Sequence, residues 1–242
     1  MSCRANPAWR RLLDPASVLT RYLNPRYAWL PDEALEQPVR ILDAGCGPKD
    51  GLMARRLFRR GCWYEGVSLW QPDPATRETR AFDRYHQQDL DATELEFLPQ
   101  RSFDYVVCSH TLEHLQDGRA VLRRLCDKVR PGGRLYLEWP SLESQTFPVC
   151  GYGLNFFDDP THRQTYGLDV ISKIIVESGL EIIFAGRRRN WLRMLLAPFL
   201  TAYHSLKARR LLLYDLWDFT GFAYVVTAKR KAGDAAVDTE AA

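Results

Sequence analysis

One short stretch near residue 40 constrains the fold more than any other part of the chain. The segment VRILDAGCGPKDG (Val39–Gly51) has the pattern of a buried strand that ends on Asp43, turns on two glycines and enters a helix. Glycines at such a turn let the backbone approach a bound molecule closely. In a parallel sheet covered by helices, ligands bind beyond the carboxyl ends of the strands. We therefore expect this turn to hold a small ligand.

The rest of the chain alternates apolar strands with helical segments. Further strands are predicted at residues 62–69, 84–90, 103–108, 134–139, 180–185 and 222–228. This alternation predicts an α/β fold with a doubly wound, Rossmann-like, seven-stranded sheet that is mostly parallel and has helices on both faces. No regular short helix separates the last two strands, so we expect the last strand to pair antiparallel.

The residues of the glycine turn indicate which charge the ligand carries. A dinucleotide site requires G-x-G-x-x-G, with a helix N-terminus facing the pyrophosphate. In this chain Asp50 stands where the third glycine should be, and we also expect it to cap the following helix. An anion fits poorly here, which disfavours a nicotinamide-dependent oxidoreductase. The Asp43 carboxylate favours a ligand with an amine or another cation.

Several motifs in the same order resemble one enzyme family. ILDAGCG (Ile41–Gly47) resembles the first motif of class I S-adenosylmethionine-dependent methyltransferases. SFDYVVCSHTLEHL (Ser102–Leu115) is similar to the fourth-strand motif of the ubiquinone-biosynthesis-like, or type 11, branch. YEGVSL, QQDL and LRRLCDKVRPGGRLYLEWP match the second, third and fifth strands. The resemblance covers about Val39–Ala228.

This resemblance implies S-adenosyl-L-methionine as the cofactor and S-adenosyl-L-homocysteine as the product. The residues that it assigns to cofactor binding are Asp43, Gly45, Cys46 and Gly47 at the amino-acid portion, Ser68 and Leu69 at the ribose, Asp89 and Leu90 at the adenine, and Ser109 and His110 on the floor. Ser68 departs from the family, which usually has an acid there. A serine hydroxyl forms weaker hydrogen bonds with the ribose hydroxyls than a charged carboxylate that binds them with both oxygens.

The resemblance also divides the chain. We expect an N-terminal helical extension (1–38), a methyltransferase domain (39–230) with an accessory helical insertion at about 187–218, and a disordered polar tail (231–242). Six cysteines without zinc-type spacing and an N-terminus without an apolar signal core favour a cytoplasmic protein.

The acceptor loop of this family follows the fifth strand, here NFFDDPTHRQTY (Asn155–Tyr166). His162 is the candidate general base, because the free pKa of histidine lies near neutrality. The alternative is that His162 and Asp159 only hold the loop in place. Glu113 and His114 are interpreted as packing residues. No metal is expected, because the sequence offers no third ligand at a suitable spacing.

The segment Arg187–Phe219 is the second unusual feature, being largely apolar with basic flanks. It is predicted to form a lid or dimer contact. The alternatives are an interfacial membrane helix over about 191–210 and RNA contact by Arg187–Arg189.

These observations together predict a methyltransferase that methylates an oxygen of a small, glycan-linked or lipid-linked acceptor by in-line transfer. The alternative is a non-catalytic, methyltransferase-like binding protein. The net charge of only +3 gives no reason to expect a nucleic-acid partner. The expected location is the cytoplasm, with peripheral contact at the inner membrane surface.

Overall fold

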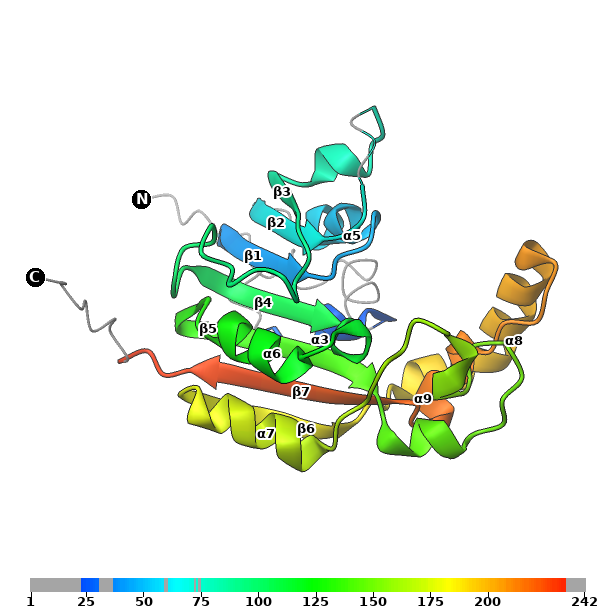
Figure 1. Cartoon of the computed structure of the whole chain (residues 1–242). Coiled ribbons are helices and arrows are strands. Elements are labelled where there is room, and N and C mark those ends of the chain that lie inside the picture. Colours follow the sequence, from blue (N-terminus) through cyan, green and yellow to red (C-terminus); the bar gives the residue numbers. More distant parts are fainter. Residues whose placement is uncertain (1–22, 31–36, 59–60, 72, 74, 234–242) are drawn as a thin grey trace, which may run out of the picture.

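The computed structural model describes residues 23–30, 37–58, 61–71, 73 and 75–233. These residues contain a seven-stranded sheet with the order β3-β2-β1-β4-β5-β7-β6 (Figure 1). The strands are β1 (Val39–Ala44), β2 (Cys62–Ser68), β3 (Arg84–Gln87), β4 (Phe103–Ser109), β5 (Val129–Pro140), β6 (Leu180–Arg187) and β7 (Ala223–Arg230). Neighbouring strands are parallel except at β7, which is antiparallel to both β5 and β6.

The predicted mostly parallel sheet with an antiparallel last strand is therefore confirmed. The insertion of β7 between β5 and β6 was not predicted. It depends on pairing between strands far apart in sequence, and hydrophobic periodicity along the chain carries no information about that pairing.

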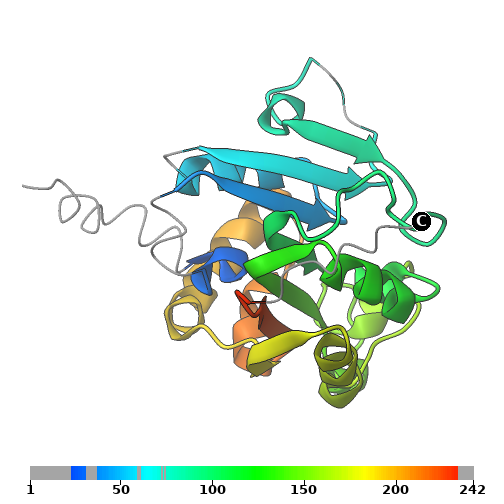
Figure 2. The same cartoon turned by 90° about the vertical axis from the view of Figure 1, so that its left-hand side faces the viewer.

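Helices lie on both faces of the sheet (Figure 2). The α-helices are α3 (Pro25–Ala28), α5 (Asp50–Leu57), α6 (Gly118–Cys126), α7 (Leu168–Glu177), α8 (Trp191–Ala208) and α9 (Trp217–Thr220). Single 3₁₀ turns are η1 (Thr79–Ala81), η2 (Leu112–His114), η3 (Leu142–Thr146), η4 (Phe156–Asp158) and η5 (Tyr214–Leu216).

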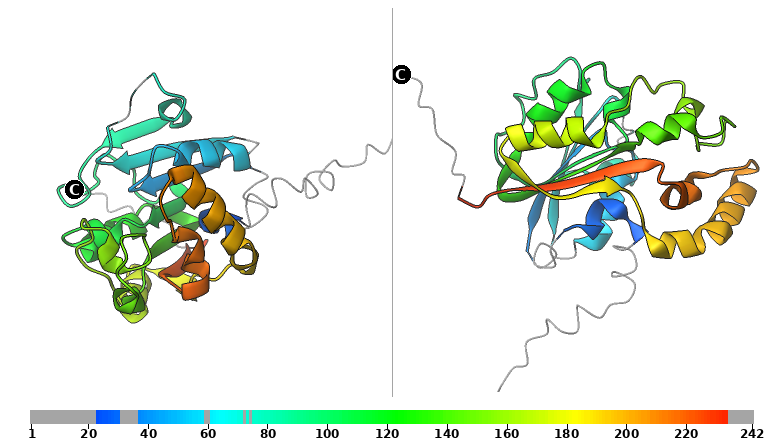
Figure 3. Two further views of the ribbon diagram at one scale, coloured as in Figure 1. Left: turned by 90° about the vertical axis from the view of Figure 1, so that its right-hand side faces the viewer. Right: turned by 90° about the horizontal axis from the view of Figure 1, so that it is seen from below.

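The two helical layers explain why the central strands are apolar on both sides. On one face α6 and α7 bury Leu122 and Ile175 against strand residues such as Leu42 and Val106. On the other face α3 and α5 bury an aromatic cluster that includes Tyr27 and Tyr64. The view from below in Figure 3 shows α6 and α7 on one side of the sheet and α3 on the other.

The strand order reverses between β1 and β4, and this reversal positions the site. The chain leaves β1 toward β2 on one side, while β4 continues the sheet on the other. Ala44, the last residue of β1, is in register with Cys108 near the end of β4. The turn after β1 and the loop after β4 therefore begin side by side at the carboxyl edge, where such sheets bind ligands.

Two segments of the predicted domain plan fall largely outside the described residues. Of the predicted N-terminal extension only 23–30 and 37–38 are described, with α3 as their helix. Of the predicted tail only 231–233 are described.

The accessory segment between β6 and β7 contains α8, η5 and α9, which extend beyond the carboxyl ends of the strands (Figure 1). Among the described residues, no helix is both long and apolar enough to cross a membrane.

Candidate functional site

The glycine turn predicted from the sequence lies at the point where the strand order reverses. The backbone N–H of Gly45 donates to the Val67 carbonyl at 2.7 Å, and the Thr111 hydroxyl donates to the Ala44 carbonyl at 3.3 Å. Gly45 has φ of +80°, and a Cβ there would lie 1.9 Å from Thr111 Oγ1. Only glycine fits this close approach of the two loops.

At Gly47 the requirement for glycine is different. A Cβ on Gly47 would contact only Asp50 Oδ2, at 3.4 Å, which is an ordinary van der Waals distance. The fold itself tolerates a side chain there. The backbone of Gly47 therefore borders open space next to the turn, as expected of a residue that a ligand approaches.

Three charged groups meet at this turn, and one of them was not predicted. Arg26 of α3 lies with Nη1 3.5 Å from Asp43 Oδ2 and 2.7 Å from Asp50 Oδ2. Asp43 is 1% exposed and also accepts a hydrogen bond from the Tyr64 hydroxyl. Arg26 thus supplies a cation to the turn from a helix that precedes it in sequence.

Burial dominates the electrostatics of Asp43. It raises the pKa of this carboxyl to about 7, with the Asp50 charge adding to the rise while Arg26 and the Tyr64 hydroxyl oppose it. Burial likewise raises the pKa of the neighbouring Cys46 thiol, which therefore stays neutral.

The prediction that Asp50 caps α5 is wrong. Asp50 is the first helical residue, and Lys49 occupies the N-cap position without a side-chain hydrogen bond. The Asp50 carboxylate instead accepts from the Gly47 N–H at 2.8 Å and pairs with Arg26. The strong cation nearby offers the carboxylate a better partner than the helix amides.

The predicted ribose and adenine residues lie together at the ends of β2 and β3. The Gln88 N–H donates to the Ser68 carbonyl at 3.2 Å, which brings Asp89 next to the end of β2. Asp89 is exposed and Leu90 is buried, while Leu69 is exposed on the far side of Ser68. The ribose-binding role of Ser68 remains a prediction, and its hydroxyl accepts only a long bond, 3.4 Å, from the Trp70 N–H.

The floor after β4 is built by Ser109 and His110. Ser109 is buried, and His110 has φ of +51°, an uncommon conformation for a residue with a side chain. The His110 ring nitrogens donate to Glu113 Oε1 and Glu138 Oε1, both at 3.1 Å. Burial alone would lower the pKa of His110, but these two carboxylates outweigh it and raise the pKa to about 9.

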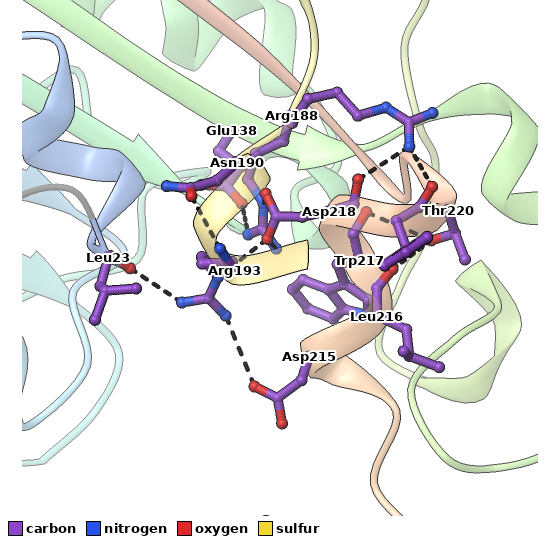
Figure 4. A network of polar contacts seen from close by, with 12 residues as sticks. Leu23, Glu138, Arg188, Asn190, Arg193, Asp215, Leu216, Trp217, Asp218 and Thr220 are labelled. Carbon is purple, nitrogen blue, oxygen red and sulfur yellow. Dashed lines mark hydrogen bonds and ion pairs between the residues drawn. The ribbon is translucent and has the colours of Figure 1, made fainter. Parts of the chain in front are cut away.

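A buried ion network extends from this floor to the accessory helices (Figure 4). Arg188 Nη1 lies 2.5 Å from Glu138 Oε1, while its Nε and Nη2 reach the two oxygens of Asp218 at 3.2 and 3.0 Å. Arg193 of α8 shares Asp218, at 3.0 Å, and also donates to the Leu23 carbonyl. Glu138 and Asp218 are nearly inaccessible, so β5, β6, α8 and α9 are connected through buried charges.

The three consecutive arginines that were considered for RNA contact each have a partner within the described part of the chain. Arg187 pairs with Glu143, Arg188 lies in the network, and Arg189 donates to the backbone carbonyls of Asp218 and Phe219.

His162 lies on the predicted acceptor loop, and one hydrogen bond fixes its tautomer. Its Nδ1 donates to the Phe156 carbonyl at 2.7 Å, which leaves Nε2 as the nitrogen with a lone pair. Nε2 lies 4.0 Å from Glu113 Oε1 and 3.9 Å from Asp159 Oδ2. The predicted base is thus placed next to the loop that follows β4.

The loop that carries His162 is held mainly by Asp158 rather than by Asp159. The Asp158 carboxylate accepts from a ring of backbone N–H groups, those of Cys150, Gly151, Gly153, Leu154 and Asn155. These bonds lower the pKa of Asp158 although burial opposes the shift. Asp159 holds Thr161, whose hydroxyl is 2.9 Å from His114 Nδ1.

The structure also brings together a donor set that sequence spacing did not reveal. Glu113, His114 and His162 each offer one ligand atom, and these atoms lie within 4.8 Å of one another. Glu113 Oε2 is buried and has no hydrogen-bond partner among the described residues. The sequence predicted no metal because it offered no third ligand. In the fold, His162, 48 positions after His114, supplies a third ligand atom, so that reason no longer holds.

Sequence reasoning missed Arg26, Glu138 and Asp218. Arg26 follows Asn24-Pro25, a helix-start signal that marks a short helix but not its partner. Glu138 lies near the carboxyl end of β5, among buried apolar residues, where an acid costs free energy unless it is paired. This acid among apolar residues was the one feature of the sequence that indicated a buried ion pair.

The comparisons with known proteins agree with this geometry. The chain matches the model of a family described as a methyltransferase domain over residues 15–184. It belongs to that family. The expected class I S-adenosylmethionine-dependent methyltransferase is thereby confirmed, and with it the cofactor.

The curated relatives are similar over part of their length. A ubiquinone biosynthesis O-methyltransferase from Aeromonas salmonicida (strain A449) is 32% identical over 101 residues, which cover 40% of this chain and 42% of that protein. The protein of the same name from Ralstonia nicotianae (strain ATCC BAA-1114 / GMI1000) is 28% identical over 148 residues, covering 60% and 61%. The chain thus spans less than two thirds of either relative.

A solved structure shows the same fold. The S-adenosylmethionine-dependent methyltransferase from Mesorhizobium loti superposes with a TM-score of 0.58 at 20% identity, covering 84% of this chain and 94% of that one.

The buried network predicts a large loss of stability in one variant. Asp218→Ala removes the carboxylate that holds both Arg188 and Arg193, and should lower the free energy of unfolding by about 3–5 kcal/mol. Urea unfolding followed by circular dichroism measures it. Glu177→Ala, which breaks the exposed pair with Lys173, is the control and should change stability by less than about 0.5 kcal/mol. Equal losses in the two variants would contradict the role of the network.

Asp43 predicts a pH dependence of stability. Its pKa is about 7 in the folded protein and about 4 in an unfolded chain. Between these values the folded state binds the additional proton, so the contribution of Asp43 to stability falls as the pH rises from about 4 to about 7. Asp43→Asn keeps an acceptor for Tyr64 but does not titrate. Urea unfolding across this range should give a wild-type curve that declines relative to the variant, and parallel curves would refute the assignment.

Proposed function

We propose that this protein transfers the methyl group of S-adenosylmethionine to a hydroxyl oxygen of a lipid-linked or glycan-linked acceptor. One observation carries the proposal: the glycine cradle and a histidine with a fixed tautomer lie on adjoining loops at the same edge of the sheet. The contacts that join them run from Gly45 to Thr111 and from Glu113 to His162.

The residues of the cradle fit the cofactor. S-adenosylmethionine has a zwitterionic amino-acid end, and the turn offers the Arg26 cation beside the carboxylates of Asp43 and Asp50. Gly47 presents backbone where a Cβ would meet only one atom. Ser68 and Asp89 lie at the ends of adjacent strands, where the ribose and adenine contacts are expected. When bound, the cofactor supplies an electrophilic methyl group on a cationic sulfur.

His162 is suited to accept the proton of the acceptor hydroxyl. Its Nδ1–H is engaged by the Phe156 carbonyl, so the lone pair of Nε2 remains available to a substrate. The imidazolium that forms is stabilised by the carboxylates of Glu113 and Asp159, both about 4 Å away. Glu113 also holds His110, which aligns the floor of the site with the base.

Aromatic side chains support an acceptor with an apolar portion. Tyr214 packs on Gly153, two residues before the predicted acceptor loop, and makes an edge contact with Trp217, at 5.4 Å between ring centroids. Trp217 stacks in turn on Phe222 and contacts the His110 ring. The wall beside the floor is thus aromatic, while Phe157 of the loop is exposed.

Cofactor binding is tested most cleanly at Gly47. Gly47→Val should leave the fold intact, because only Asp50 Oδ2 approaches the new Cβ, and should weaken binding of S-adenosylhomocysteine by at least about tenfold. Titration calorimetry measures it. Gly233→Val, at a glycine with nothing within 4 Å, is the matched control. Gly45 is unsuitable, since its variants also disturb Thr111.

Two results would overturn the cofactor assignment. Unchanged affinity in Gly47→Val would remove the turn from the binding site. Absence of heat from the wild-type protein at millimolar ligand would favour the non-catalytic binding protein.

The base is tested by His162→Ala. Methyl transfer from labelled S-adenosylmethionine into a bacterial total lipid extract should fall by about two to four orders of magnitude. Affinity for S-adenosylhomocysteine and the melting transition should stay unchanged, because no cradle residue contacts His162 in the described part of the chain. Weakened cofactor binding would show a structural role. Activity that is lost with EDTA and restored by a divalent cation would instead assign Glu113, His114 and His162 to cation binding.

A further inference from the structure

The outer face of α8 is apolar and has no partner among the described residues. Side chains spaced four and then three residues apart form one stripe, and each is 59–79% exposed: Trp191, Leu195, Phe199, Tyr203 and Leu206. Single exposed apolar residues are ordinary, but a continuous row of five large ones marks an interaction surface.

The opposite face of α8 fixes the helix to the protein. Ala197 is fully buried, Arg193 binds Asp218, and His204 Nδ1 lies 2.7 Å from Asp215 Oδ2. The exposed stripe therefore cannot turn inward without breaking these contacts. Whatever covers it comes from outside the described chain.

The charges around the stripe select the chemistry of the partner. The stretch 187–214 contains no aspartate or glutamate. Lys207, Arg209 and Arg210, at the C-terminal end of α8, are exposed and form no ion pair with a described residue. An apolar stripe that ends in unpaired cations complements a surface with an apolar interior and anionic headgroups.

A second copy of the chain is a poorer partner. Antiparallel pairing of two stripes would bring Lys207, Arg209 and Arg210 of one copy toward the N-terminal end of the other α8, which follows three further arginines. α8 itself has no acid to pair with them. The cations at the end of one α8 would then gain no acidic partner from the α8 of the other copy.

We propose that α8 binds the surface of an anionic phospholipid bilayer, with its stripe in the headgroup–acyl boundary and its C-terminal cations at the headgroups. α8 extends beyond the carboxyl ends of the strands, on the same side as the acceptor loop (Figure 1). The candidate site would then open near the membrane surface. This deepens the proposed function by favouring a lipid-linked acceptor, but the binding itself does not depend on catalysis.

Vesicle flotation of the full chain tests the proposal. The wild-type protein should float with phosphatidylcholine–phosphatidylglycerol vesicles and not with phosphatidylcholine alone. Phe199→Glu places a charge at the centre of the stripe and should reduce the bound fraction at least about tenfold. Neutralising Lys207, Arg209 and Arg210 to Gln should cost about fivefold per charge. Val176→Glu, at an apolar position of α7 that is 58% exposed, is the control and should float like the wild type.

Several outcomes would overturn it. The proposal fails if the wild-type protein stays in the soluble fraction on anionic vesicles, or if Phe199→Glu floats unchanged. A dimer in solution that Phe199→Glu dissociates, without flotation of the wild type, would assign the stripe to a second copy. Calorimetry with S-adenosylhomocysteine on the same samples separates failure of membrane binding from failure of the proposed function.

Discussion

The arrangement of the site depends on Arg188, which is buried between Glu138 of β5 and Asp218 of α9. Three buried charges are costly to desolvate, and the cost is offset only when the geometry satisfies every group. Here Asp218 is held by two nitrogens of Arg188, and Glu138 accepts from Arg188, His110 and Tyr136. These pairs hold the accessory helices in the observed position, since displacing them would leave a charge buried and unpaired.

This docking joins two segments that are separate in sequence. The Trp217 indole N–H donates to the Gly153 carbonyl at 2.6 Å, and the Leu213 N–H donates to the Tyr152 carbonyl at 3.0 Å. The stretch that leads from β5 into the predicted acceptor loop and the segment before β7 thus form one wall beside His110. The Asp158 carboxylate accepts hydrogen bonds from the backbone amides on the β5 side of this wall. Both segments of the wall are therefore held in place. The specificity of the enzyme for its acceptor is expected to reside in this wall.

The glycine turn at the end of β1 is built in a different way. Its shape comes from backbone, through Gly45 and Gly47, while its charge comes from Arg26, Asp43 and Asp50. The backbone part is local, so a motif encodes it. The charge balance is not local, because Arg26 reaches the turn only after α3 packs its neighbour Tyr27 into the aromatic core. This contrast explains why the sequence predicted a cationic ligand from Asp43 but gave no sign of Arg26 at the same turn.

The sequence by itself determined the alternating strands and helices, the glycine turn at the end of β1 and the membership of the methyltransferase family. Hydrophobic period, turn residues and motif order are properties of short segments, and short segments are what a sequence displays. It also predicted His162 as the candidate base on the loop after β5, and that role stays a prediction. Only the tertiary structure decided that β7 lies between β5 and β6, and that Arg188 is a buried structural charge rather than part of a basic surface. The same holds for the approach of His162 to Glu113 and His114. Each of these features depends on contacts between residues tens of positions apart in the sequence. Those contacts stabilise the protein only once the sheet has assembled.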